Sequence, residues 1–185
     1  MTRINESIIC AGSGGQGVML LGKFLANAGM TLGLNVTWFP SYGAEVRGGT
    51  AHSFIRISSS AIASPVVYLP GTAIIMNRPS LDKFENSLVP GGLLILNVSM
   101  CGQRPERDDI DIVEAPLTEE AVKLGNIKVA NMIAAGIYAA RKKIFDKELM
   151  VSIIEKMAGT RKELVPVNVK AIEKGMEIAG SQDGG

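Results

Sequence analysis

Short apolar runs, separated by polar or glycine-rich segments, recur through the first two thirds of the chain. Residues 7–11 and 93–97 are apolar almost throughout, which favours central parallel strands buried on both faces. Residues 54–58 alternate apolar and polar positions, a pattern typical of a half-exposed strand. Further strand candidates are residues 35–39, which Pro40 closes, residues 72–77 and residues 111–114. Residues 40–53 show no period and are predicted to be a long loop.

The helical period of 3.6 residues appears after residue 17. Val18, Leu21, Leu25 and Ala28 share one helical face, with Gly33 as a plausible stop. We expect a short helix over residues 80–88 and another that starts near Thr118. Residues 126–142 are apolar almost all round, as in a helix buried against another layer or another subunit. Two more helices are predicted at residues 146–157 and 167–179.

The order of these elements indicates the fold class. Residues 1–39 predict one strand–helix–strand unit, and strands continue to alternate with helices after it. We therefore predict a doubly wound α/β fold with a mostly parallel sheet and a helical C-terminal part. A single domain is expected over residues 1–180, with a flexible tail at residues 181–185.

Composition narrows the classes of function. The 185 residues are 46% hydrophobic and 20% charged, with a formal net charge of +1. The chain contains no strongly basic stretch of the kind that indicates a nucleic-acid partner. It also contains no run of about 18 apolar residues that would indicate a membrane span. Cys10 and Cys101 are far apart, and four thiolates are normally needed for an iron–sulfur cluster. We expect a cytoplasmic protein that binds no metal by itself.

The segment GSGGQG, residues 12–17, stands between a predicted strand and a predicted helix. Glycines there allow a tight turn and let backbone N–H groups at a helix start approach an anion. A dinucleotide site would also need an acidic side chain at the end of the second strand. The first acid after that strand is Glu45, which argues against NAD. Close packing of strand on helix remains the alternative role for these glycines.

A second glycine-rich segment, SYGAEVRGGT, covers residues 41–50. In a doubly wound sheet it would leave the same carboxyl edge as GSGGQG. Arg47 could pair with a carboxylate or phosphate there, and Tyr42 could stack or form a hydrogen bond. A salt-bridged surface loop is the alternative. His52 is interpreted as a strand residue rather than a general base.

Together, these segments resemble a known family. GSGGQGV at residues 12–18, PSYGAEVRGGTAHSFIRIS at residues 40–58 and LVPGGLLILN at residues 88–97 are similar to the gamma subunit of 2-oxoacid:ferredoxin oxidoreductases, the pyruvate/ketoisovalerate oxidoreductase gamma family. The pairing of the two glycine loops at this separation is specific to that family. One departure is Gly71, where the family commonly has an aspartate.

The resemblance implies a subunit, inactive alone, of an enzyme that oxidatively decarboxylates a 2-oxoacid to an acyl-CoA and passes electrons to ferredoxin. Thiamine diphosphate, iron–sulfur clusters and CoA would belong to the complex, with alpha and beta subunits, and a delta or ferredoxin-like subunit, as partners. A short free-standing chain favours 2-oxoglutarate over pyruvate or a branched-chain oxoacid. The implied ligand-contacting residues are Gly12, Gly14, Gly15, Gln16 and Gly17 in the first loop, and Ser41, Tyr42, Gly43, Glu45, Arg47, Gly48 and Gly49 in the second.

Two other functions stay open from the sequence. One is a stand-alone nucleotide- or anion-binding regulatory module that uses the same loop, and the other is a purely structural assembly subunit. The apolar helix over residues 126–142 and the glycine loops further predict tight subunit contacts, since large apolar patches rarely stay bare. The isolated chain could self-associate through such a surface.

Overall fold

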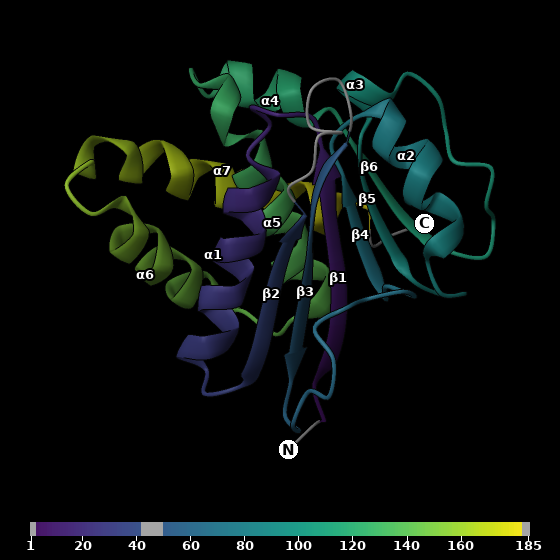
Figure 1. Ribbon diagram of the computed structural model, residues 1–185. Coiled ribbons are helices and arrows are strands. Elements are labelled where there is room, and N and C mark those ends of the chain that lie inside the picture. The colour runs from purple at the N-terminus through teal and green to yellow at the C-terminus, as the bar shows by residue number, and fades with distance from the viewer. Residues whose placement is uncertain (1–2, 42–49, 183–185) are drawn as a thin grey trace.

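A computed structural model describes residues 3–41 and 50–182 of the chain. Its centre is a six-stranded sheet in the order β2-β3-β1-β4-β5-β6 (Figure 1). The strands are β1 (Asn5–Gly12), β2 (Asn35–Ser41), β3 (Ala51–Ser58), β4 (Thr72–Ile75), β5 (Leu93–Asn97) and β6 (Asp111–Ala115). The β1, β4, β5 and β6 strands pair in parallel, whereas β3 is antiparallel to both of its neighbours.

The expected strand–helix–strand unit is present, with one strand inserted into it. Because β1 and β2 both run antiparallel to β3, they run parallel to each other. They are not neighbours, since β3 lies between them. The prediction of a doubly wound, mostly parallel sheet is confirmed, with helices on both faces and a helical C-terminal part (Figure 1).

The predicted loop over residues 40–53 was too long. Pro40 does not close β2, because it pairs with Ser53 inside the β2–β3 ladder. Strand β2 is the edge of the sheet, and an edge strand tolerates the missing N–H of proline on its open side. At the other end, β3 begins at Ala51 rather than Phe54.

Helices cover both faces of this sheet. They are α1 (Val18–Thr31), α2 (Arg78–Phe84), α3 (Val98–Cys101), α4 (Leu117–Lys123), α5 (Ala130–Lys142), α6 (Lys147–Ala158) and α7 (Val165–Ser181). Helices α1 and α5 pack on one face and α2 and α3 on the other (Figure 1). None of the helices in the described part of the chain is long and apolar enough to cross a membrane.

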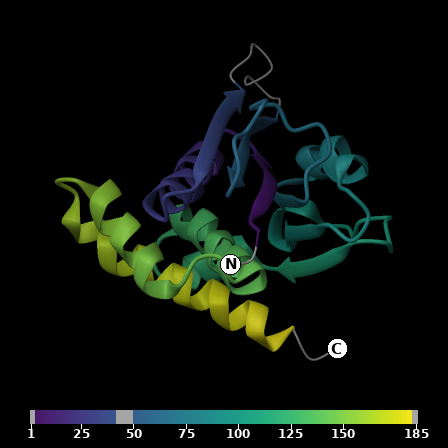
Figure 2. The same cartoon turned by 90° about the horizontal axis from the view of Figure 1, so that it is seen from below.

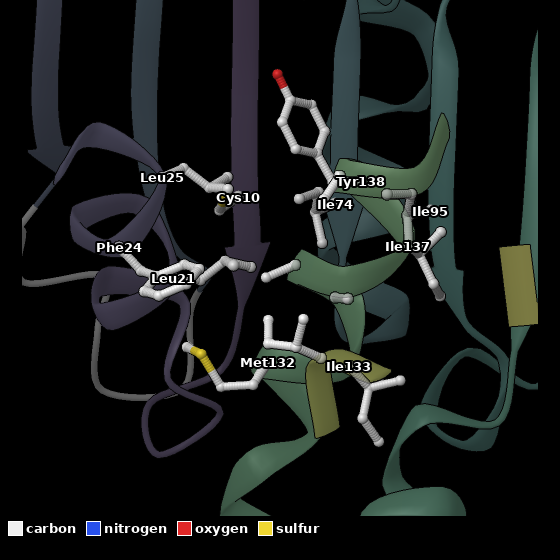
Figure 3. Close-up of a cluster of buried hydrophobic side chains, with 14 of the residues drawn as sticks. Cys10, Leu21, Phe24, Leu25, Ile74, Ile95, Met132, Ile133, Ile137 and Tyr138 are labelled. Atoms are coloured by element: carbon white, nitrogen blue, oxygen red, sulfur yellow. The ribbon is translucent and has the colours of Figure 1, made fainter. Parts of the chain in front are cut away.

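Alternate residues of the central strands contribute to two separate apolar cores. On β1, Cys10 faces the α1/α5 side and Ile9 faces the α2 side, as the period of two in a strand requires. Figure 3 shows the larger core, in which the α1 side chains meet those of α5 above the central strands. The labelled α5 side chains are Met132, Ile133, Ile137 and Tyr138.

Helix α5 is enclosed within this chain. Residues 130–139 of the helix are all buried, because the sheet covers one side and α7 covers another (Figure 2). Gly136 and Gly175 let the two backbones touch: a Cβ on Gly136 would lie 2.9 Å from the Ile172 carbonyl carbon and closer still to its oxygen. Of the two alternatives expected for this apolar helix, burial against another layer is the one that residues 130–139 show, since the sheet and α7 cover them.

Several predicted helices begin or end a few residues from their true bounds. The expected helix over residues 126–142 starts with a 3₁₀ turn, Ile127–Val129, capped by the Asn126 side chain, which accepts a hydrogen bond from Lys128 N at 3.0 Å. Helix α2 begins at Arg78, where Asn77 caps it by accepting from Ser80 N at 3.1 Å. Helix α3 was not predicted at all.

Candidate functional site

The glycine loop links the end of β1 to the start of α1. Gly15 has φ 89° and Gly17 has φ 72°, backbone values that favour glycine. Between them, Gln16 N donates to Ser13 O at 3.2 Å and closes a turn. Gly17 is the N-cap of α1, so the chain passes from this turn directly into the helix. The predicted position of the loop is thus correct.

The Gln16 side chain ties the loop to the next parallel strand. Its Oε1 accepts from Ser13 N at 2.7 Å, and its Nε2 donates to Met76 O at 2.9 Å. Met76 directly follows β4, which pairs with β1. Both ends of the amide are therefore used inside the chain, which gives Gln16 a positioning role in this structure.

The four glycines of the loop serve two different purposes. A Cβ on Gly12 would lie 2.6 Å from Gln16 Oε1 and 2.8 Å from Met76 Cβ, and one on Gly17 would lie 3.0 Å from Asn131 Cγ. These two positions need glycine for close packing. Gly14 and Gly15 are exposed, and no described atom lies within 4 Å of a Cβ built on either. This pair leaves bare backbone for a ligand or another chain to approach.

The start of α1 adds electrostatic attraction for an anion. Its first turn carries no acidic side chain, and no side chain caps it. Unpaired N–H groups and the aligned peptide dipoles make such a helix end favourable for negative charge. Beside the exposed Gly14–Gly15 backbone, this geometry suits a phosphate or carboxylate.

The second glycine segment begins and ends beside the first. Ser41 ends β2 and pairs with His52, while Ala51 pairs with Gly12, the last residue of β1. The expectation that both loops leave the same edge of the sheet therefore agrees with the positions of their strands. The remaining predicted residues of this loop lie outside the described residues; they are Tyr42, Gly43, Glu45, Arg47, Gly48 and Gly49.

An amide network lines the same carboxyl edge, and the sequence did not reveal it. Asn77 donates through Nδ2 to Ser13 Oγ. Asn97 donates to Met76 O at 3.3 Å and to Thr118 Oγ1 at 2.9 Å. Asn97 is the last residue of β5, and Asn77 follows β4 after one residue. That position was the available signal, because parallel strands bring their carboxyl ends to one edge.

Asn131 of α5 holds the other end of the glycine loop. Its Nδ2 donates to Gly17 O at 3.1 Å, and its side chain is 1% exposed. The contact joins residues 114 positions apart in the chain. Nothing in a local pattern could have indicated it. The site is therefore built from β1, β4, β5 and α5 together.

The other candidate groups lie in the interior. His52 is a β3 residue, as predicted, and its ring packs against Phe54 and Phe84 with centroids 5.3 and 5.0 Å away. Cys10 and Cys101 belong to cores on opposite faces of the sheet. Burial raises the pKa of both thiols, that of Cys101 to about 11. In residues 3–41 and 50–182, no three His, Cys, Asp or Glu side chains gather in a way that could hold a metal ion.

Similarity to known proteins shows the family of this chain. The family model for pyruvate ferredoxin/flavodoxin oxidoreductase matches residues 7–178. The chain belongs to that family. This membership confirms the resemblance found in the glycine loops and extends it across almost all of the described fold.

Individual members of the family are similar to most of the chain. Ketoisovalerate oxidoreductase subunit VorA of Methanothermobacter thermautotrophicus is 31% identical over 91% of this chain, which spans only 35% of VorA. 2-Oxoglutarate synthase subunit KorC of Methanocaldococcus jannaschii is 28% identical over 96% of this chain and 95% of its own length. The gamma subunit of a keto/oxoacid ferredoxin oxidoreductase from Geobacter sulfurreducens superposes with a TM-score of 0.82 at 26% identity, covering 95% of this chain and 99% of that one.

Proposed function

We propose that this chain is the gamma subunit of a multi-subunit 2-oxoacid:ferredoxin oxidoreductase, inactive alone and working in the cytoplasm. The assembled enzyme would convert a 2-oxoacid and CoA to an acyl-CoA and CO₂, with two electrons passing to ferredoxin. Alpha and beta subunits are the proposed partners. Thiamine diphosphate would supply the decarboxylation chemistry and iron–sulfur clusters the electron path, both in the complex rather than in this chain.

One observation carries this proposal. The similarity to KorC and to the Geobacter gamma subunit covers 95% and 99% of those proteins, so the match is end to end. It is not a likeness confined to one shared module of a larger protein. This chain spans only 35% of the VorA relative, so that match covers one part of a longer protein.

The glycine loop supports a role at a shared ligand site. Gly14 and Gly15 expose backbone beside the uncapped start of α1, which suits the phosphates of CoA or thiamine diphosphate. Gly12, Gln16 and Gly17 would hold this surface in place through their internal contacts. We propose the second loop as a further wall, with Ser41, Tyr42, Gly43, Glu45, Arg47, Gly48 and Gly49 as its contact residues.

Among 2-oxoacids we favour 2-oxoglutarate. KorC, a 2-oxoglutarate synthase subunit, matches this chain at nearly equal length, and a KorC from Methanothermobacter marburgensis is 34% identical over 140 residues. VorA, a ketoisovalerate oxidoreductase subunit, matches with only part of its length. Branched-chain oxoacids are therefore the second candidate class.

Co-purification and turnover test the proposal. The tagged chain, expressed in its native host, should bring down thiamine- and cluster-bearing subunits, and the complex should reduce a viologen dye when 2-oxoacid and CoA are added. Purification of the native chain without such partners would overturn the proposal.

In the same complex, Arg47→Ala should lower CoA-dependent turnover with assembly intact, while the exposed control Lys170→Ala should not. Unchanged turnover of Arg47→Ala would mean that the second loop has only a structural role.

A further inference from the structure

We propose that a groove between α1, α5, α6 and the start of α7 is the docking site for an acidic, amphipathic segment of a partner subunit. This inference rests on the proposed function, since it names the surface through which the subunit is held. The groove is separate from the glycine loop, and the exposed glycine backbone does not line it.

The groove has an apolar floor. It encloses about 420 Å³, within the range of sites that hold a bound group. Helices of both the N-terminal and C-terminal parts of the chain build it. Its apolar lining consists of Leu20, Phe24, Val129, Met132, Ile154, Met157, Ala158 and Leu164. Five of these eight side chains belong to the larger core or pack against it, so the floor is preformed.

The rim of the groove is positively charged. Lys128 and Arg161 line it, and both are exposed. Within the described part of the chain, neither side chain forms an ion pair, and no acidic residue lines the groove. Two unpaired cations above an apolar floor are complementary to a segment that carries apolar side chains and carboxylates.

The apolar surface around the groove favours a protein segment over a small anion. Leu20 is 49% exposed and Ile127, next to Lys128, is 57% exposed. A small ligand on the floor would leave Ile127, which does not line the groove, in water. A helix or strand of a partner would cover both Leu20 and Ile127, and burial of large apolar side chains is favourable.

The position of the groove links docking to the glycine loop. Asn131 lines the groove and also holds Gly17 O at 3.1 Å. Leu20 and Phe24 lie on α1, the helix that the loop begins. A partner seated here would contact both elements that fix the end of the loop.

Binding of variant chains to the remaining subunits tests the inference. We would measure the affinity of the full-length chain for the assembled thiamine- and cluster-bearing subunits. The double reversal Lys128→Glu/Arg161→Glu should weaken binding about tenfold or more. A matched reversal, Lys156→Glu/Lys170→Glu, changes exposed lysines of α6 and α7 that do not line the groove, and should have little effect.

An apolar pair of variants gives an independent measurement. Leu20→Ser should weaken binding, whereas Met100→Ser should not, because Met100 is equally exposed, at 48%, but lies on α3 across the sheet. A photo-crosslinking residue at position 157 should then join the chain to an acidic segment of a thiamine- or cluster-bearing subunit.

The outcomes separate the two proposals. If the wild-type chain binds none of those subunits, the proposed function fails. If the wild-type chain binds them and the groove variants bind as tightly as their controls, the docking inference alone fails. It also fails if the cross-link joins two copies of this chain, or if native mass spectrometry of the isolated chain finds a retained small anion that competes with the cross-link.

Discussion

At the scale of single residues, Gln16 sets the shape of the glycine loop because its amide serves one donor and one acceptor of the backbone. Gln16→Ala leaves Ser13 N without this acceptor and Met76 O with only the longer bond from Asn97. Unsatisfied groups of this kind cost about 1–3 kcal/mol. We expect the free energy of unfolding, measured with urea, to fall by about 1–2 kcal/mol.

The variant Gln16→Glu separates the two hydrogen bonds. A glutamate can still accept from Ser13 N, but its carboxylate faces Met76 O instead of donating to it. We expect a loss of stability at pH 7 that shrinks as the carboxyl is protonated at lower pH. Equal stability of Gln16→Glu and wild type at pH 7 would contradict the role of the Met76 contact.

The two thiols give a pH-dependent prediction. Burial is the main cause of the raised pKa of Cys101, about 11, and the nearby Arg78 guanidinium only partly opposes it. At pH 8 about one thiol in a thousand is then ionised, and the thiolate is the reactive form. In the folded chain, a disulfide reagent should react slowly with Cys101 and about tenfold faster per pH unit up to pH 10. Cys101→Ser separates its signal from that of Cys10.

Denaturant supplies the control for the thiol experiment. Both cysteines should react rapidly once the chain is unfolded, because the cause of the raised pKa is burial. Rapid reaction of both thiols in the folded chain at pH 8 would mean that the two cores are open to the reagent.

At the scale of elements, the α5–α7 crossing depends on two glycines. A Cβ on Gly175 would lie 2.8 Å from Ile137 N and closer still to Ile133 O, so Gly175→Ala must push the helices apart. We expect a loss of about 2–4 kcal/mol in unfolding free energy, in the range of overpacked or disrupted cores. Thermal and urea unfolding measure it.

Gly180→Ala is the matched control on the same helix. Gly180 is exposed, and no described atom lies within 4 Å of a Cβ built there. Alanine has the higher helix propensity by about 1 kcal/mol, so this variant should be neutral or slightly more stable. Equal losses for Gly175→Ala and Gly180→Ala would contradict a steric cause.

The pattern of apolar and polar residues predicted most helices and strands, because these elements form through contacts between residues close in the sequence. Buried parallel strands such as β5 are continuous apolar runs, and α1 carries its apolar stripe at helical spacing. The place of β3 could not be predicted in this way, since its insertion between β1 and β2 is decided by contacts across the sheet. The prediction that Pro40 ends the strand was wrong for the same reason. Whether a proline ends a strand depends on the place of that strand in the sheet, and β2 is an edge strand.

The candidate site was predicted only in part. The sequence located the glycine loop and gave it the correct strand and helix, because glycine spacing is a local signal. It did not distinguish packing glycines such as Gly12 from open ones such as Gly14, which depends on neighbours far along the chain. The Asn77 and Asn97 contacts were missed because they form only when β1, β4 and β5 align.

At the scale of the whole molecule, the proposed complex should discriminate between 2-oxoacids. We expect viologen reduction with 2-oxoglutarate to exceed that with pyruvate or 2-oxoisovalerate by at least about tenfold in kcat/KM, because site polar groups left unpaired by the wrong substrate are costly. The measurement uses the intact complex from the native host.

Comparison of the three substrates under the same CoA concentration is the control for that experiment. A clear preference for 2-oxoisovalerate would contradict the choice of substrate and favour the VorA-like alternative, while it would leave the gamma-subunit proposal in place. The isolated chain should reduce no dye with any of the three.

The hydrogen bond between Asn131 and Gly17 has a consequence for biosynthesis. The loop leaves the ribosome early, but its anchor is made 114 residues later. At 5–20 residues per second, that interval lasts about 6 to 23 s. During translation the nascent loop therefore lacks its contact with α5 for this interval, and the loop geometry described above can be complete only when the second half of the polypeptide has been made.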